Sequence, residues 1–134
     1  RIGVIVVVVR DNQVLLVHRL KEPHKGKWGM PGGAVHLGET LVQAAEREVL
    51  EETGVVVLAQ GVIETKEEIH PDATGKIQFH YLGVVLNALW ISGEPAGADD
   101  AAEARWVPDD EIKTLPGFPD TEHLVRQALL ATVL

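Results

Sequence analysis

The sequence predicts an α/β fold in which a mixed β-sheet lies between helices. Residues 2–9 are β-branched apart from Gly3, which is typical of a strand buried on both faces. Residues 41–53 have the apolar spacing of one central helix, with extended segments before and after it. Residues 121–133 form a second amphipathic pattern. The chain has 134 residues, enough for a full core, so we expect one domain over residues 1–134.

The segments before the central helix predict a hairpin followed by a basic loop. Residues 11–12 form a turn, and residues 13–18 return as a second strand. The basic loop at residues 19–27 is interpreted either as a solvated loop or as a cationic lip over phosphates. Trp28 follows this loop, and we expect it to pack beneath the loop in preference to stacking on a base. Arg19 and Trp28 are both kept as candidate ligand-binding residues.

The central helix has a clear signal at each end. Thr40 and Gln43 form a T-x-x-Q capping box that starts the helix at about Leu41. Gly54 supplies the left-handed residue that ends it. The apolar residues expected to anchor the helix on the sheet are Val42, Ala45 and Val49.

The segments after the helix alternate between extended stretches and loops. Gly61 is expected to mark a β-bulge, and His80 is expected on the opposite strand face from Phe79 and Tyr81. The expected elements, in order, are strands at 55–58 and 60–69, a loop at 70–75, a strand at 77–90, an acidic loop at 92–100, a strand at 104–107, a short helix at 109–115, and a C-terminal helix at 121–133 with Leu124, Val125, Ala128 and Leu129 facing inward.

The central helix also carries three carboxylates, three and four residues apart: Glu48, Glu51 and Glu52. Like charges at this spacing repel by a few tenths of a kcal/mol per pair, so a helix built only for stability would avoid them. A hard divalent cation such as Mg²⁺ needs oxygen ligands of this kind. Arg47 lies four residues before Glu51 and can fix its orientation. Gly32 and Gly33 let the backbone approach a phosphate closely.

The full pattern resembles the Nudix box at every specified position: Gly33, Glu39, Arg47-Glu48-Val49, Glu51-Glu52 and Gly54-Val55. We refer to residues 33–55 as the box. The resemblance implies a Nudix hydrolase, which cleaves a diphosphate linked to another moiety. It also implies the Nudix αβα sandwich with a mixed central β-sheet, and Mg²⁺ as cofactor with Mn²⁺ as an alternative.

The same resemblance assigns roles to the box residues. Glu48, Glu51 and Glu52 would hold the metal together with Gly32, and Arg47 would orient Glu51. Glu39 would be a further ligand or would support the ligands, and Gly33 would position the loop against the diphosphate. The general base would be Glu51 or one carboxylate of the acidic segment before Trp106, which offers Asp99, Asp100 and Glu103.

The substrate is indicated less directly. Pro71 stands sixteen residues after Val55, which resembles the ADP-ribose pyrophosphatase subgroup. Position 73 is Ala, whereas enzymes of dinucleoside polyphosphates would have a tyrosine there. Hydrolysis of nucleoside triphosphates, including oxidised ones, remains an alternative, and so does a module that binds nucleotides without cleaving them. The candidate specificity residues outside the box are Arg19, Trp28, His80 and Phe118.

Composition excludes several other classes of function. A net charge of −8 disfavours binding to nucleic acid polymers or anionic membranes. The chain has no cysteine, so there is no disulfide framework, which fits a reducing cytoplasm. The longest apolar run, residues 4–9, is too short to span a bilayer. We therefore expect a cytoplasmic protein whose partner is a small nucleotide, and the sequence allows a homodimer.

Overall fold

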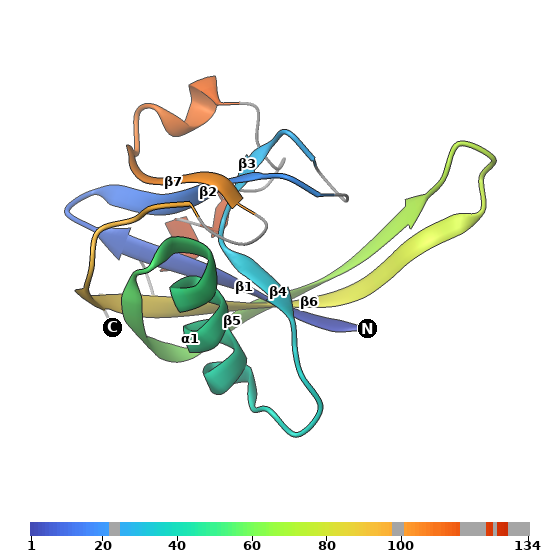
Figure 1. The fold of residues 1–134 in the computed structure, drawn as a ribbon, viewed down its shortest axis with the longest axis horizontal. Helices are drawn as coiled ribbons and strands as arrows, with labels where there is room; N and C mark the ends of the chain where they lie inside the picture. Colours follow the sequence, from blue (N-terminus) through green and yellow to red (C-terminus); the bar gives the residue numbers. More distant parts are fainter. Residues whose placement is uncertain (22–24, 98–100, 116–122, 125, 129–134) are drawn as a thin grey trace.

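A seven-stranded mixed sheet forms the centre of the molecule, as predicted (Figure 1). The structure is a computed structural model that describes residues 1–21, 25–97, 101–115, 123, 124 and 126–128. The strand order is β3-β2-β1-β6-β5, with β4 paired to β1 and β7 paired to β2. The β1–β6 pair is parallel and the other pairs are antiparallel. The strands are β1 (Ile2–Arg10), β2 (Gln13–Arg19), β3 (Trp28–Gly29), β4 (Gly32–Ala34), β5 (Val56–Pro71), β6 (Ile77–Ser92) and β7 (Ala101–Pro108).

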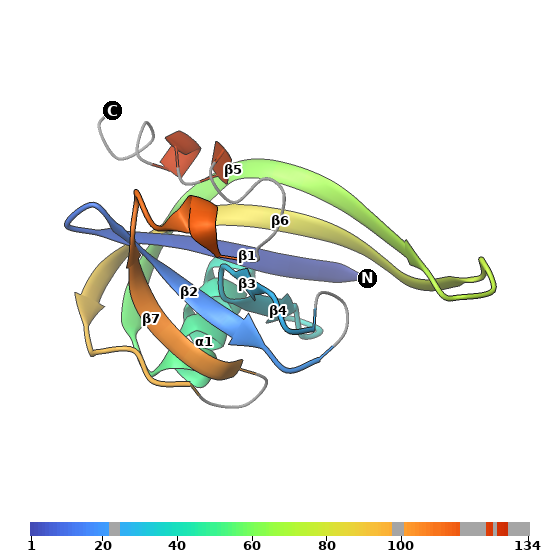
Figure 2. The same cartoon turned by 90° about the horizontal axis from the view of Figure 1, so that it is seen from above.

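Helices lie on both faces of this sheet, which confirms the expected αβα arrangement (Figures 1 and 2). The box helix α1 (Leu41–Thr53) packs on one face. The 3₁₀ helix η1 (Ile112–Thr114) and the helical residues 123, 124 and 126–128 pack on the other. Among the described residues, no helix has both the length and the apolar character needed to cross a bilayer.

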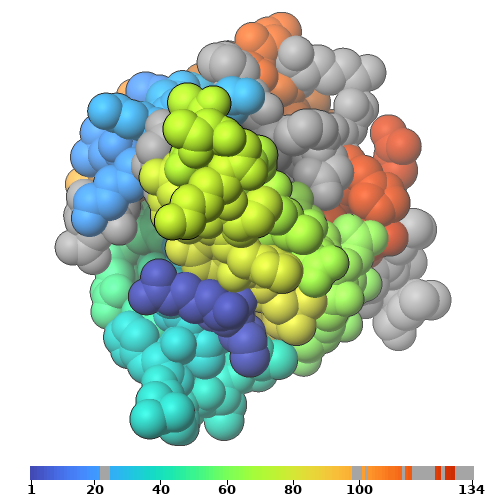
Figure 3. Space-filling model, turned by 90° about the vertical axis from the view of Figure 1, so that its right-hand side faces the viewer, coloured from blue at the N-terminus to red at the C-terminus, as the bar shows by residue number. Residues whose placement is uncertain are grey.

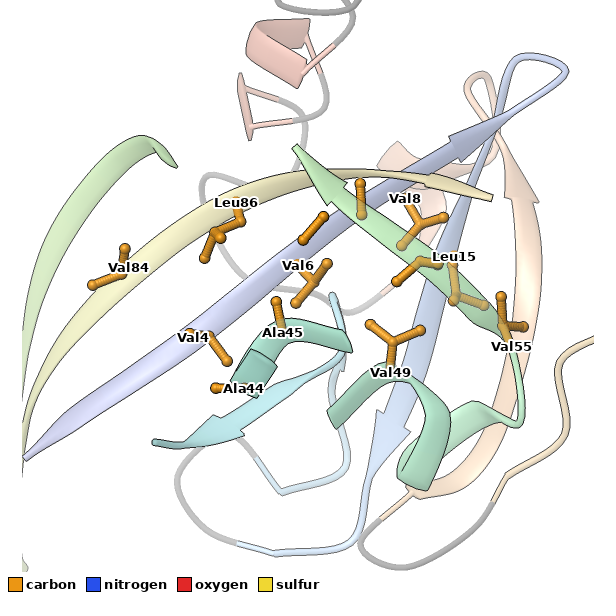
Figure 4. Packing of buried hydrophobic residues seen from close by; sticks show 13 residues of the cluster. Val4, Val6, Val8, Leu15, Ala44, Ala45, Val49, Val55, Val84 and Leu86 are labelled. Carbon is orange, nitrogen blue, oxygen red and sulfur yellow. The ribbon is translucent and has the colours of Figure 1, made fainter. Parts of the chain in front are cut away.

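β1 is buried on both faces because it lies between the two helical layers. Val4, Val6 and Val8 point toward α1 (Figure 4). Val7 belongs to the cluster on the opposite face, which includes Leu124. Each fully buried valine contributes roughly 1.5–3 kcal/mol of transfer free energy. This burial explains why the strand is β-branched at nearly every position.

The ends of α1 are those predicted from the sequence. The Thr40 hydroxyl accepts from the Gln43 N–H at 3.1 Å, and the Thr40 N–H donates to the Gln43 side chain at 2.9 Å. Gly54 is left-handed with φ 76°. The prediction of Val42 as an anchor was wrong, because its side chain is 39% exposed. Val42 lies in the first turn of the helix, before the buried positions begin. The buried residues of the helix are Ala44, Ala45, Val49, Glu52 and Thr53.

The hairpin formed by β5 and β6 differs from the prediction at its tip. His70 and Pro71 continue β5 and do not belong to the loop. The turn is shorter because the Asp72 carboxylate accepts three hydrogen bonds, from the N–H and hydroxyl of Thr74 and the N–H of Lys76. The predicted bulge at Gly61 is present as a register shift against β6.

This hairpin projects beyond the start of β1 (Figure 1). The first residue of β1 that pairs with β6 is opposite Leu82, so the part of β6 before Leu82 extends past β1. Seen from its projecting end, the first residues of β1 lie between the hairpin and the loop that leads into α1 (Figure 3). Two backbone hydrogen bonds make these links, from the Leu82 N–H to Arg1 and from the Val35 N–H to Ile2.

The C-terminal third agrees only partly with the prediction. Instead of a helix over residues 109–115, three residues form η1, since so short a segment more readily forms a 3₁₀ turn. The strand predicted at 104–107 is longer, because β7 begins at Ala101. Of the inward residues predicted in the last helix, Leu124 and Ala128 are buried, whereas Val125 and Leu129 lie outside the described residues.

Replacing Thr40 by alanine should lower the free energy of unfolding by about 1 kcal/mol, because the Gln43 N–H then loses its capping acceptor. Thr40→Ser keeps the hydroxyl and should retain most of the stability. Urea unfolding of the three proteins measures the effect. Equal stability of wild type and Thr40→Ala would contradict the capping interpretation.

Candidate functional site

The candidate site forms where β4 brings two glycines against the carboxylate face of α1. Gly32 and Gly33 pair with β1, opposite Ile5 and Val4. A Cβ on Gly32 would overlap the backbone oxygen of Val4, and one on Gly33 would lie 2.6 Å from the Glu48 carboxylate. Glycine is therefore required at position 32, and at position 33 it leaves room for the Glu48 carboxylate.

Glu52 is a buried carboxyl, with only 5% of its surface exposed. Its Oε1 accepts the N–H of Gly32 at 3.2 Å. Burial, followed by the hydrogen bond with Glu48 and by the charge of Glu48, raises the pKa of Glu52 to about 8. The Gly32 N–H and the positive charge of Arg19 act in the opposite direction on this pKa. Glu48 and Glu52 are thus a close carboxyl pair that favours a bound proton.

Arg47 joins the remaining acids of the box. Its Nη1 donates to Glu48 Oε1 at 2.7 Å and to Glu51 Oε2 at 3.2 Å, so the predicted Arg47–Glu51 contact is present. Its Nε and Nη2 donate to the two oxygens of Glu39 at 2.6 and 2.9 Å. Nη2 also donates to the backbone oxygen of Ala34 at 3.0 Å. The guanidinium therefore orients three carboxylates and the end of β4 together.

Glu39 is held by this arginine at the edge of the site. Its Oε1 also accepts the N–H of His36 at 3.0 Å. The hydrogen bonds with Arg47 and then with the His36 N–H lower the pKa of Glu39 to about 2. Its contacts make Glu39 the anchor of Arg47.

The donor set fits a hard divalent cation, although the described residues contain no group of three metal-ligating side chains already gathered around one point. The donors are carboxylate oxygens, which Mg²⁺ prefers. The Glu48–Glu52 pair favours a proton, and metal binding to such ligands releases protons. Glu51 is about half-exposed, with 45% of its side chain accessible, and it contacts Arg47. Its side chain would have to turn away from Arg47 to join the other two.

The structure brings Arg19 to the box. Arg19 ends β2, and its positive charge acts on Glu52. Its partner on β7 is Ala101, which packs with Val17. Trp28 is buried, stacks on His18 with ring centroids 5.2 Å apart, and has the Arg105 guanidinium 5.0 Å from its centroid. These contacts favour the packing interpretation of Trp28.

Other candidates lie elsewhere. His80 is opposite Ile69 on the projecting hairpin and contacts Glu67 at 3.2 Å, and Pro71 ends β5 on the same hairpin. The structure does not bring His80 or Pro71 to the box. Three further candidates are outside the described residues: Asp99, Asp100 and Phe118.

Glu103 is described, and it faces away from α1. It lies opposite His18 on β2, and side chains directly opposite each other share a sheet face. His18 stacks on Trp28, which belongs to the cluster on the face opposite α1. A role for Glu103 as base gains no support from this position.

Sequence reasoning missed two contributors to the site. The Ala34 carbonyl accepts from Arg47, and the His36 N–H donates to Glu39. Both are backbone groups, so no side-chain pattern could have indicated them. Glu46 was also missed; its carboxylate accepts the Ala59 N–H at 3.0 Å and joins α1 to β5.

The Glu39–Arg47 pair predicts a specific loss of stability in acid. Because the folded pKa of about 2 is below the ordinary value of 4.5, the pair stabilises the fold above pH 4.5, and this contribution disappears as pH falls toward 2. The difference in unfolding free energy between wild type and Glu39→Gln should therefore be largest near neutrality and shrink toward pH 2. Urea unfolding across this range measures it, and a difference that grew in acid would contradict the assignment.

Comparisons with family models and with known proteins agree on one family. The family model described as NUDIX domain matches residues 1–128. The ADP-ribose pyrophosphatase of Methanocaldococcus jannaschii is 33% identical over 121 residues, covering 90% of this chain and 68% of the relative. The oxidized purine nucleoside triphosphate hydrolase of Danio rerio is 35% identical over 115 residues, covering 81% of this chain and 66% of the relative. The chain thus spans about two thirds of the length of these two relatives.

Solved structures share the fold. A NUDIX hydrolase from Nitrosomonas europaea superposes with a TM-score of 0.78 at 26% identity, covering 97% of this chain and 88% of that one. The NUDIX domain of Shewanella oneidensis NrtR complexed with ADP ribose gives a TM-score of 0.74 at 26% identity, covering 98% and 87%. Because the family model covers nearly the whole chain and the box residues occupy one site, the chain belongs to the Nudix hydrolase family.

Proposed function

We propose that the protein is a Mg²⁺-dependent hydrolase that cleaves the diphosphate of ADP-ribose or a similar nucleoside diphosphate sugar. The observation that carries the reaction is the Glu48–Glu52 pair against the glycines of β4, with Arg47 ordering the other acids. Two similarities support the substrate class: the Methanocaldococcus jannaschii relative is named ADP-ribose pyrophosphatase, and the Shewanella oneidensis domain was solved with ADP ribose.

Nudix hydrolases generally need a divalent metal ion. Glu48, Glu51 and Glu52 would hold Mg²⁺ here, with Mn²⁺ as an alternative. The metal supplies charge neutralisation at the diphosphate and lowers the pKa of bound water. The Gly32 backbone supports this site through its N–H to Glu52.

The other residues position groups and move a proton. Two hydrogen bonds to Glu39 fix the orientation of Arg47. In that orientation Arg47 donates to Glu48 and Glu51 and holds both in place. Arg19 adds positive charge beside the box, which favours an anionic substrate in a protein of net charge −8. Glu51 is our candidate base because it is the most exposed of the three box acids and can reach solvent water. Asp99 and Asp100 remain alternatives outside the described residues.

A second candidate is hydrolysis of nucleoside triphosphates, including oxidised ones. It is favoured by the relative of Danio rerio, which is named for oxidized purine nucleoside triphosphates. A binding module without catalysis is disfavoured because every box glutamate is retained. We further propose that residues 1–134 work as one domain, in a reducing compartment such as the cytoplasm; a homodimer remains a prediction.

Replacing Glu52 by glutamine should reduce hydrolysis by orders of magnitude, since the buried ligand loses its charge while keeping its shape. Glu46→Gln, on the same helix but at a position that the Nudix pattern does not specify, should retain activity because the amide oxygen can still accept the Ala59 N–H. Initial rates with Mg²⁺ and with chelator measure both variants. Full turnover by Glu52→Gln, or by wild type in chelator, would exclude the metal mechanism.

A substrate panel tests the proposed specificity. ADP-ribose should be cleaved with a higher kcat/KM than normal or oxidised nucleoside triphosphates and diadenosine polyphosphates, with AMP among the products. Product identification by chromatography distinguishes the reactions. A triphosphate cleaved much faster than ADP-ribose would replace the substrate assignment and leave the family unchanged. Tight binding of a nucleotide without cleavage would favour the sensing module.

A further inference from the structure

Arg10, the last residue of β1, lies in an aromatic cluster that the proposed chemistry does not use. Its guanidinium carbon is 3.7 Å from the ring centroid of Trp90 and 5.7 Å from that of Trp106. Its Nη1 donates to Glu94 Oε1 at 3.0 Å. A planar guanidinium can stack on rings and bind a carboxylate simultaneously, which an ammonium group does less well.

The cluster holds the beginning of the connection from β6 to β7. The indole N–H of Trp90 donates to the Gly93 oxygen at 2.9 Å, and Arg10 binds the next residue, Glu94. Gly93 has φ 93°, and a Cβ there would lie 2.7 Å from the Gly54 oxygen. This connection therefore passes close to the residue that ends α1.

A hydrogen bond fastens the connection to α1. The Ala96 N–H donates to the Thr53 oxygen at 2.9 Å, and the Thr53 hydroxyl donates to Val49 at 2.6 Å. Thr53 directly follows Glu51 and Glu52. Arg10 is thus connected, through the backbone of residues 94–96, to the helical turn that carries two of the box carboxylates.

We propose that Arg10 is a positioning residue for the metal-binding carboxylates, an inference that rests on the proposed function. Arg10 keeps residues 93–96 closed over the end of α1, and this contact keeps Glu52 within reach of the Gly32 N–H. Groups that orient metal ligands through such contacts affect metal affinity without touching the ion.

The test is a titration of the full chain with Mn²⁺ in the absence of substrate, with free Mn²⁺ measured by electron paramagnetic resonance. Arg10→Met should weaken Mn²⁺ binding by about tenfold, the lower end of the range for residues that orient metal ligands. Arg10→Lys keeps the charge but loses the stacking, and its affinity should be intermediate. In assays with ADP-ribose, kcat should fall while KM stays near the wild-type value.

Arg105→Met is the matched control. Arg105 lies 5.0 Å from the Trp28 centroid and contacts Glu111 at 3.1 Å, so this variant removes the same kinds of contact away from the end of α1. It should lower the thermal midpoint about as much as Arg10→Met and leave Mn²⁺ affinity unchanged. Equal losses of Mn²⁺ affinity in both variants, or no loss in Arg10→Met, would overturn the inference.

Gly93→Ala tests the same contact independently, should Arg10→Met fail to fold. The added Cβ pushes the connection away from Gly54 while Arg10 is retained, so Mn²⁺ affinity should fall in the same direction. Unchanged affinity in a folded Gly93→Ala protein would also overturn the inference. Wild-type protein that bound no Mn²⁺ would instead reject the proposed metal site itself, and the inference with it.

Discussion

The close approach of α1 to β4 is the constraint on which the rest of this site depends. Glu52 is buried where a helix of an α/β protein would ordinarily place an apolar side chain. That position is tolerated because the Gly32 N–H and Glu48 satisfy the carboxyl. A side chain at position 32 would overlap the backbone of β1, and one at position 33 would displace the Glu48 carboxylate. The glycines, the buried acid and the anchoring strand β1 are therefore one structural unit.

The charges around this unit explain why the outer acids and the Glu48–Glu52 pair have different roles. Arg47 neutralises the outer acids, and Glu39 keeps that arginine in one orientation. In the inner pair, Arg47 contacts Glu48, whereas Glu52 is buried and accepts the backbone N–H of Gly32. A proton or a metal ion must therefore reduce the repulsion between the two carboxylates. A protein of net charge −8 can thus receive a polyanionic substrate when a divalent ion occupies the site.

The long hairpin shows why nearness to the box in sequence did not translate into nearness in space. Pro71 and His80 follow the box within some twenty-five residues, yet both belong to the part of β5 and β6 that extends past the start of β1. A strand rises by about 3.3 Å per residue, so a few residues carry a side chain far from the helix. The contact of His80 with Glu67 is local to that hairpin.

The sequence by itself determined the box helix, both of its ends, the doubly buried first strand and the identity of the acidic residues. These features depend on local spacing and on residues with strong conformational preferences, such as Thr40 and Gly54. Only the tertiary structure decided which acid is buried. Helical periodicity places Glu48 and Glu52 on the same side of the helix, one turn apart, and does not show which of the two packs against the sheet. It also decided that Glu103 faces away from α1, because strand register and sheet face are set by pairing between distant segments. The contacts of Arg47 with Ala34 and of Arg10 with Trp90 join residues far apart in the chain, and no local pattern encodes them.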